Sequence, residues 1–336
     1  MRPPTSPPAA PTPRPSTRPA TPPLTRPRPL ARGAALGVLA LAACGGGDGG
    51  DPDAPGAGDA GPDGGGARDR VGVIEVIEDR WVFPADSGGG ESRTGQVRAR
   101  FFQGREPRFH REVMRAGACA LRTHEVVQCT PACTDGLCVG DDVCEPWPTY
   151  VSAGRLTLTG LTTPIQIDPQ DNLYYPDGVL PPELFADGAT VTATLAGATL
   201  PAMTLTAGGV PAITPDITGG ELVVPYPAVG DAVVRWTPAG GDARVRLTLN
   251  ANNRGHGMPF IAIIECDVVD ADGQIAVAPA LLDAFPETDA WFICAGTDCP
   301  PSSLVRYRRA AVAVGEQEVE LVVGNAFTFG IEHDLP

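Results

Sequence analysis

The sequence contains no lysine, so all 25 of its basic residues are arginines. It has only 4 histidines, and aromatic residues make up 6% of the chain. The 40 acidic residues outnumber the arginines and give a formal net charge of −15. Because an acidic surface repels a phosphate backbone, this balance argues against nucleic acid as a partner. The low aromatic content leaves few rings for the stacking surface of a dedicated carbohydrate-binding protein.

Short catalytic motifs are also absent. The sequence has no His-Glu-x-x-His zinc motif, no Gly-x-Ser-x-Gly nucleophile motif and no P-loop. A pair of carboxylates of the glycosidase type is recognised by its separation in space, so a hydrolase stays open as the less favoured alternative. We expect a binding or structural protein of unknown ligand rather than an enzyme, and no cofactor apart from the calcium considered below.

No apolar run approaches the roughly 20 residues that a bilayer-spanning helix needs. The short run at 33–41 follows a segment with 12 prolines, six arginines and no acidic residue, and it is followed by Ala42, Ala43 and Cys44. A positive segment, a short apolar run and small residues before a cut define a secretory signal. Residues 1–43 are therefore predicted to be a signal peptide with a long Pro- and Arg-rich start.

The Leu-Ala-Ala-Cys sequence at 41–44 resembles the lipobox of bacterial lipoproteins, which are cut by the lipoprotein signal peptidase. The resemblance implies that Cys44 becomes a lipidated N-terminus, and two or more acyl chains anchor a protein stably to a membrane. In this family an Asp after the cysteine often retains the protein in the inner membrane, and here that position is Gly45. We expect an exported protein anchored to the outer membrane or the cell surface.

Residues 45–69 are almost wholly Gly, Asp, Ala and Pro. Such a segment buries too little apolar surface to offset the entropy lost on ordering, so 44–70 is predicted to be a lipidated cysteine and a disordered stalk. The 19 arginines and 40 acidic residues after Cys44 leave a net charge of −21 on this mature chain. The folded part is predicted to comprise a β segment with a Cys-rich loop at 71–150 and a β-sandwich at 151–336, integrated with each other.

Eight cysteines remain once Cys44 is set aside, and an even number in an exported chain predicts a disulfide framework. They are Cys119, Cys129, Cys133, Cys138, Cys144, Cys266, Cys294 and Cys299. Five fall within 119–144 and three within 266–299, so if all eight pair, at least one bridge joins the two groups. The predicted bridges are Cys294–Cys299, Cys119–Cys266, Cys129–Cys138 and Cys133–Cys144.

The four cysteines at 129–144 are also a candidate zinc site, because four thiolates bind zinc tetrahedrally. Their spacing lacks the Cys-x-x-Cys pair of common zinc sites, and an oxidising compartment favours disulfides. The disulfide interpretation is therefore preferred.

Short alternating or β-branched runs separated by Gly, Pro and Asp predict an all-β fold, an antiparallel β-sandwich or jelly-roll-like domain with little helix. In 244–250, Val245, Leu247 and Leu249 alternate with polar residues, as in a half-buried strand. The expected strands lie at 71–78, 96–102, 155–161, 189–197, 221–225, 232–236, 243–250, 260–269, 274–278, 303–314, 317–324 and 327–332. Single helical turns are expected at 111–116 and 280–285.

Two places are candidate ligand sites. Tyr174 and Tyr175 lie between probable turn sequences and are typical of a sugar-stacking platform, which makes a carbohydrate-binding module an alternative function. Asp270 and Asp272 in Asp-Ala-Asp-Gly resemble part of a calcium loop, although the other ligands of such a loop are missing and a hairpin turn explains the sequence equally well.

The cysteine cluster followed by the strand pattern at 152–161, together with Glu265 to Val269, is similar at the level of pattern to secreted, cysteine-containing lipoproteins of large-genome, GC-rich bacteria. This similarity implies no particular activity. The expected partners are the membrane, through the lipid anchor, and either a polysaccharide or another envelope protein.

Overall fold

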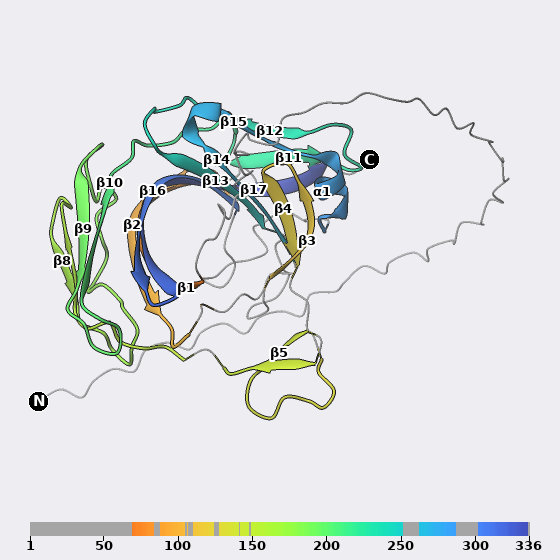
Figure 1. Ribbon diagram of the computed structural model, residues 1–336. Coiled ribbons are helices and arrows are strands. Elements are labelled where there is room, and N and C mark those ends of the chain that lie inside the picture. The colour runs from red at the N-terminus through yellow and green to blue at the C-terminus, as the bar shows by residue number, and fades with distance from the viewer. Residues whose placement is uncertain are drawn as a thin grey trace, which may run out of the picture. The chain divides into compact units, whose positions relative to one another are not determined.

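A computed structural model describes residues 69–83, 88–104, 106, 110–123, 128–140, 142–147, 149–250, 262–286 and 302–334 (Figure 1). The predicted signal peptide, Cys44, the greater part of the stalk (44–68) and the Cys294–Cys299 bridge lie outside these residues. The described part is dominated by strands, as the all-β prediction requires. None of its helices is long and apolar enough to cross a membrane.

The main sheet has nine strands in the order β2-β1-β17-β16-β13-β14-β4-β3, and the ninth, β11, also pairs with β17. Its strands are β1 (Arg70–Val82), β2 (Glu91–Phe101), β3 (Arg111–Ala116), β4 (Cys119–Thr123), β11 (Glu221–Pro225), β13 (Arg244–Asn250), β14 (Ala262–Val269), β16 (Ser302–Val314) and β17 (Gln317–Asp334). Strands from both ends of the folded region therefore share one sheet.

Two pairs in this sheet, β1 with β17 and β11 with β17, are parallel, whereas the sequence predicted an antiparallel arrangement. β16 and β17 form an antiparallel hairpin around Gly315, but β1 lies far from β17 in the sequence, so no tight turn fixes their relative direction. β1 ends at Val82, and β11 pairs with the next residues along the same edge of β17. A glycine is needed at position 220 for this close approach of the two strands, because a Cβ there would lie only 2.4 Å from the carbonyl oxygen of Val82.

A second sheet, in the order β10-β9-β7-β8, packs on one half of the main sheet. Its strands are β7 (Leu156–Thr159), β8 (Ile165–Ile167), β9 (Thr190–Leu195) and β10 (Met203–Gly208). The core between the two sheets includes Ile74 of β1, Phe101 of β2, Leu158 of β7 and Leu321 of β17, all fully buried. This packing confirms the sandwich expected from the alternating strands.

A second core lies on the other half of the main sheet. There β12 (Ala232–Arg235) pairs with β15 (Gln274–Val277), and α1 (Pro279–Ala284) adds Leu281 and Leu282. Alternate residues of the long strand β17 serve both cores, Leu321 the first and Phe329 the second. Because β17 continues through Gly324, the two strands expected at 317–324 and 327–332 are one.

Asn325 occupies the position on β17 between the two cores, and it is buried. Its side-chain nitrogen donates to Glu78, at 3.0 Å, and its oxygen accepts from the backbone N–H of Ile213, at 3.4 Å. Glu78 also accepts from the backbone N–H groups of Leu184 and Phe185. Burial raises the pKa of Glu78, and the three donors oppose that rise. This polar junction ties loops from both cores to the main sheet.

One of the two predicted helical turns is correct. Residues 280–285 coincide with α1, which starts at a proline in its first turn. The turn expected at 111–116 is wrong, because those residues form the edge strand β3. Pairing with β4 outweighs the weak local helix preference of this short segment.

Candidate functional site

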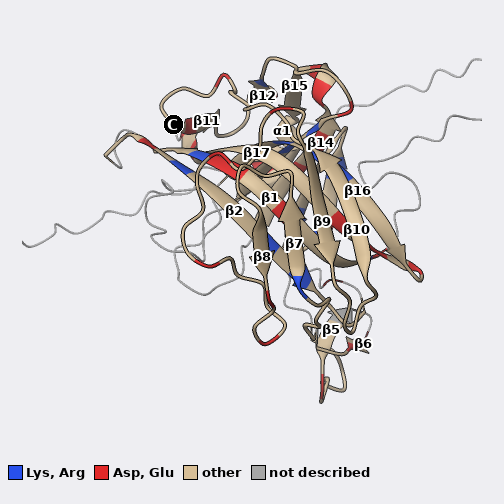
Figure 2. Cartoon of the chain, turned by 90° about the vertical axis from the view of Figure 1, so that its left-hand side faces the viewer, with Lys and Arg blue, Asp and Glu red and all other residues tan. Residues whose placement is uncertain are grey.

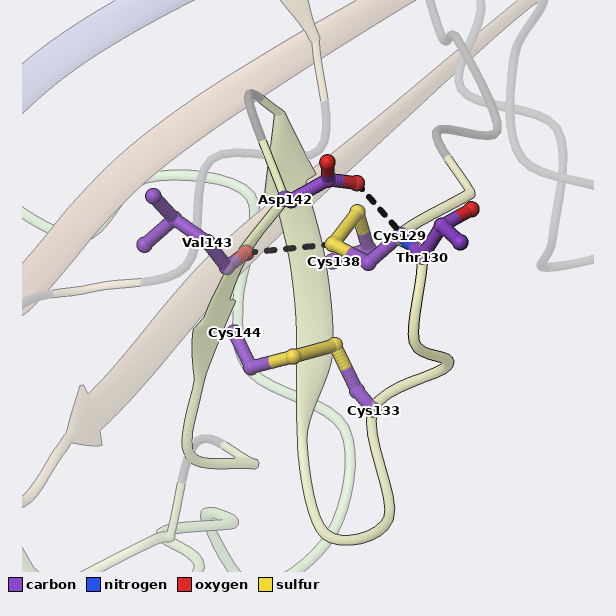
Figure 3. The surroundings of a disulfide bond; sticks show 7 residues. All are labelled: Cys129, Thr130, Cys133, Cys138, Asp142, Val143 and Cys144. Atoms are coloured by element: carbon purple, nitrogen blue, oxygen red, sulfur yellow. Dashed lines mark hydrogen bonds between the residues drawn. A yellow bond between two sulfur atoms is a disulfide. The ribbon is translucent and has the colours of Figure 1, made fainter.

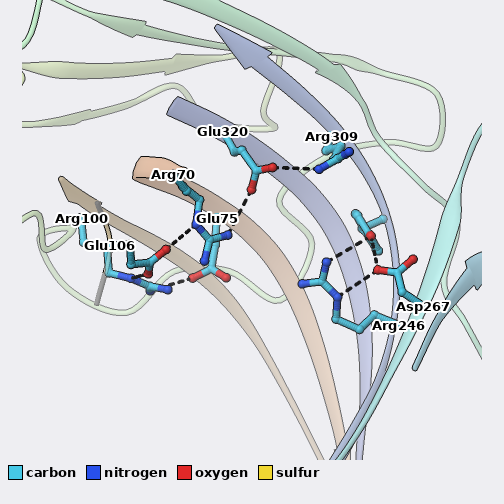
Figure 4. Close-up of polar contacts among 9 residues, drawn as sticks. Arg70, Glu75, Arg100, Glu106, Arg246, Asp267, Arg309 and Glu320 are labelled. Carbon is cyan, nitrogen blue, oxygen red and sulfur yellow. Dashed lines mark hydrogen bonds and ion pairs between the residues drawn. The ribbon is translucent and has the colours of Figure 1, made fainter. Parts of the chain in front are cut away.

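The face of the main sheet that points away from both cores carries many arginine and acidic side chains, and we call it the polar face. It is built by the alternation of the strands, because neighbouring residues of β1, β2, β16 and β17 point to opposite sides. Val73 lies on this face and Ile74 on the core side. Two ion-pair networks lie on the polar face (Figure 4).

The first network crosses β2, β1, β17 and β16. Glu320 accepts from Arg70 at 3.0 Å and from Arg309 at 2.9 Å, so one carboxylate bridges two strands. Arg70 and Arg100 both donate to Glu106. Arg100 also pairs with Glu75 at 3.3 Å. Glu320 is 8% exposed although it is charged, which its two guanidinium partners explain.

The second network is centred on Asp267 of β14. Its carboxylate accepts from Arg244 at 2.7 Å, from Arg246 at 3.1 Å and from the hydroxyl of Tyr307 at 2.5 Å. The guanidinium of Arg246 also lies 5.0 Å from the centre of the Tyr307 ring. Burial raises the pKa of Tyr307, and the charge of Asp267 raises it further, against the opposing effect of the two arginines.

The polar face therefore holds carboxylates that are paired with guanidinium groups and a tyrosine that stays protonated at neutral pH. A protonated phenol is not a base. In these two networks the ion pairs link neighbouring strands of the sheet.

Asp79 lies on the polar face beside these networks. It accepts from the hydroxyl of Thr328 at 2.8 Å and from the amide of Gln96 at 3.1 Å. Burial raises the pKa of Asp79 above its usual range, against the lowering effect of its two hydrogen bonds and of nearby Arg98.

Asp79 is expected to make the protein less stable as the pH rises. The folded state holds its proton more tightly than the unfolded chain, whose carboxyl ionises near pH 3.9, so the free energy of unfolding falls above about that pH. The Asp79→Asn substitution keeps the shape of the side chain but removes its titration. Urea unfolding between pH 3.5 and 7 should show a smaller decline for Asp79→Asn than for the natural protein. The same pH dependence of the free energy of unfolding in Asp79→Asn and in the natural protein would contradict a raised pKa of Asp79.

The outer face of the four-stranded sheet is uncharged. Its outward positions are Thr157, Thr159, Gln166, Thr190, Thr192, Thr194, Thr204 and Thr206. Thr192 lies opposite both Thr159 and Thr206, and the hydroxyls of Thr192 and Thr206 are 3.3 Å apart. Figure 2 views the chain from this side. On a strongly acidic chain this face offers neutral hydroxyl groups, which can donate and accept hydrogen bonds with a neutral polar ligand.

Three disulfides are present in the described residues, and they are the three pairs proposed from the sequence. Cys119 of β4 bonds to Cys266, its direct neighbour on β14. Cys129–Cys138 and Cys133–Cys144 lie in the loop that contains the hairpin of β5 (Leu137–Gly140) and β6 (Val143–Glu145) (Figure 3). The first bridge joins distant parts of the chain, and the other two hold a local loop.

The acidic pair proposed for calcium is part of a structural turn. Asp270 begins a short 3-10 helix, and its carboxylate accepts from Trp236 at 3.0 Å, Ala239 at 2.6 Å and Arg306 at 2.9 Å. Asp270 is fully buried and already has a cationic partner. These contacts use the oxygens that calcium would need, so the geometry does not support a calcium site at Asp270 and Asp272.

The two tyrosines proposed as a sugar platform are separated by burial, which corrects that hypothesis. Tyr174 is 3% exposed, accepts from the N–H of Ala153 and donates to the carbonyl of Gly154, both at 2.8 Å. Its ring also packs edge-on against Phe101. Tyr175 is 64% exposed. Adjacent residues of an extended chain point to opposite sides, so the pair cannot form one stacking surface.

The sequence analysis did not single out Arg306, Asp267 or Tyr307. Arg306 sits at a position of β16 that points into the second core, in phase with Leu304. A charged residue in the inward phase of an alternating strand is the signal that identifies such a buried group. Tyr307 follows it on the outward phase, and nothing in the sequence links it to Asp267.

Together the fold and these networks define a disulfide-bonded, all-β protein with networks of ion pairs on one face of its main sheet. No family model, no curated protein and no solved structure matches this chain. A role for it therefore has to be argued from its own residues.

Proposed function

We propose that this chain is an exported lipoprotein of the bacterial envelope, whose β-sheet head has a non-catalytic binding or structural role. The observation that carries the proposal is the disulfide framework of the head. Disulfides persist in oxidising compartments outside the cytoplasm and are rare within it. The described residues of the head contain three, including one that joins residues 147 positions apart. A signal-like N-terminus ending in Leu-Ala-Ala-Cys supports export with lipidation at Cys44.

Two surfaces support a binding or structural role. On the polar face, carboxylates and guanidinium groups are paired with each other, which stiffens the sheet. The threonine face of β7–β10 presents neutral hydroxyl groups on strands that a buried core holds in place. Such a face suits a neutral polar ligand, among which a polysaccharide is the class proposed, or packing against another envelope protein.

The proposal predicts that Cys44→Ala abolishes lipid attachment. Cells are labelled with an alkyne fatty acid and fractionated, and the chain is followed by immunoblot. The natural chain should carry label and stay in the membrane fraction, whereas Cys44→Ala should lose the label and either become soluble or remain in the membrane fraction as an unlabelled, uncut precursor. Cys299→Ala serves as the control, because it removes a cysteine without touching the lipobox. Label and membrane attachment that survive Cys44→Ala would refute the proposal.

A further inference from the structure

The two disulfides of the Cys-rich loop bring four sulfur atoms into one cluster. The Sγ atoms of Cys129, Cys133 and Cys138 all lie within 4.8 Å of one another, and Cys144 is bonded to Cys133 (Figure 3). Zinc–sulfur bonds of about 2.3 Å in a tetrahedron place sulfur atoms roughly 3.8 Å apart. The bonded sulfur atoms of Cys129 and Cys138 have to separate by about 2 Å to reach the spacing of a zinc tetrathiolate, and the separations from Cys133 exceed that spacing by no more than about 1 Å.

Contacts other than the disulfides also hold this geometry. β5 and β6 pair in register, with Cys138 opposite Cys144. The carboxylate of Asp142, at the turn of this hairpin, accepts from the backbone N–H of Thr130 at 2.7 Å, which keeps the segment that follows Cys129 against the hairpin. These hydrogen bonds do not involve the sulfur atoms, so cutting the sulfur–sulfur bonds does not remove them directly.

The loop has little else to hold it together. Among the residues between 128 and 147 whose burial the structure describes, which leaves out 139–141, Cys129 is the one buried apolar residue. Val143 and Trp147 are more than half exposed. A segment without its own apolar core needs covalent or metal cross-links to stay folded. Once its disulfides are reduced, a metal held by the four thiolates can replace them.

We propose that reduction converts this loop into a zinc site formed by Cys129, Cys133, Cys138 and Cys144. Two dithiol molecules supply four electrons and four protons by thiol–disulfide exchange, each becoming a disulfide itself, and leave four thiols in the loop. One Zn²⁺ then binds the four sulfurs and displaces four protons. Four soft thiolate ligands in a tetrahedron select zinc over hard cations such as calcium and magnesium. Exchange with two small-molecule disulfides, each reduced to two thiols, restores both bridges and releases the zinc, so the loop carries a cross-link in either redox state.

The nearby charges oppose this site but do not prevent it. Asp135, Asp142 and Glu145 lie in the loop, and the sequence from 128 to 147 contains no arginine. Their repulsion raises the cost of forming thiolates, but these acids are on an exposed hairpin where water and salt screen them. Zinc binding is therefore expected to strengthen with added salt and with rising pH.

The test uses the mature chain reduced with a phosphine, which competes for zinc less than a dithiol does, in the absence of oxygen. Zinc is measured by native mass spectrometry, and cobalt is added as a spectroscopic substitute. We expect one zinc per reduced chain, none in the oxidised chain, and the intense visible bands of tetrahedral cobalt–thiolate coordination. Cys133→Ser/Cys144→Ser should lose both. Cys119→Ser/Cys266→Ser is the matched control, because it removes one bridge and no ligand.

A second readout does not depend on the folding of any variant. Zinc should protect Cys129, Cys133, Cys138 and Cys144 of the reduced natural chain from alkylation, and should not change the alkylation of the buried Cys119 and Cys266. The proposal is overturned if the reduced chain takes up no stoichiometric zinc. It is equally overturned if binding or protection depends on Cys294 and Cys299 instead. The lipid anchor plays no part in this test, so its outcome is independent of the envelope assignment.

Discussion

Arg306→Met is expected to destabilise the protein by about 3–5 kcal/mol, because it leaves a buried carboxylate without its cation. Arg306 and Asp270 are 3% and 1% exposed, and their side chains meet at 2.9 Å. The same guanidinium donates to the carbonyls of Pro211, Ala212 and Thr237. The substitution therefore removes the donor that joins β16 to two loops and to the Asp270 turn. Urea unfolding, followed by circular dichroism, measures the change.

The matched control is Arg155→Met, which breaks the exposed pair between Arg155 and Asp168. Water and salt screen exposed pairs, so little change is expected there. The double variant Arg306→Met/Asp270→Asn should recover part of the stability lost by Arg306→Met, because it also removes the stranded charge. Equal small effects at Arg306 and Arg155 would show that the buried pair contributes no more than a surface pair.

Removing the Cys119–Cys266 bridge is expected to cost nearly as much. Chain-entropy arguments assign about 5 kcal/mol, as an upper value, to a bridge spanning the 147 positions between these cysteines. Both cysteines are buried and belong to the second core, so Cys119→Ala/Cys266→Ala also loses packing. Thermal unfolding without reductant should show a lower midpoint for this variant.

The control for that bridge is Cys129→Ala/Cys138→Ala, whose cysteines are 9 positions apart. Because this bridge ties only the local loop, its loss should loosen the loop and change the unfolding of the sheets much less. In the presence of reductant, the natural chain should approach the Cys119→Ala/Cys266→Ala variant. Midpoints that fall equally in both variants would contradict a special role for the long-range bridge.

The sequence predicts strands well where one side of the strand is buried. In β13 the alternation of Val245, Leu247 and Leu249 matches their burial in the second core. It predicts partners less well, because pairing depends on distant segments. Nothing within 71–78 indicates that β1 lies parallel to the end of the chain. For the same reason the sequence predicts a helical turn at 111–116, although these residues pair with β4 in the sheet.

For the candidate sites, too, the sequence does not predict contacts between distant segments. Parity requires at least one bridge between the two groups of cysteines but does not select the individual pairs, whereas the turn at Asp270 could be predicted from its Asp and Gly. Whether Tyr174 or Tyr175 is buried depends on Phe101, which is far away in the sequence. The Asp267 network brings together β13, β14 and β16, so its members share no local pattern. Contacts of this kind become visible only when the strands are paired.

The position of β17 has a consequence for the order in which the main sheet can form during synthesis. β1 is made early, yet one of its two neighbours in the sheet is β17, about 250 residues later. Contacts that are this distant in sequence form slowly, because a long loop must close first. The sheet cannot be completed until residues 317–334 have been synthesised. Because β1 and β17 are neighbours, the strand at the start of the folded region gains its full set of sheet partners only after nearly the whole chain has been made.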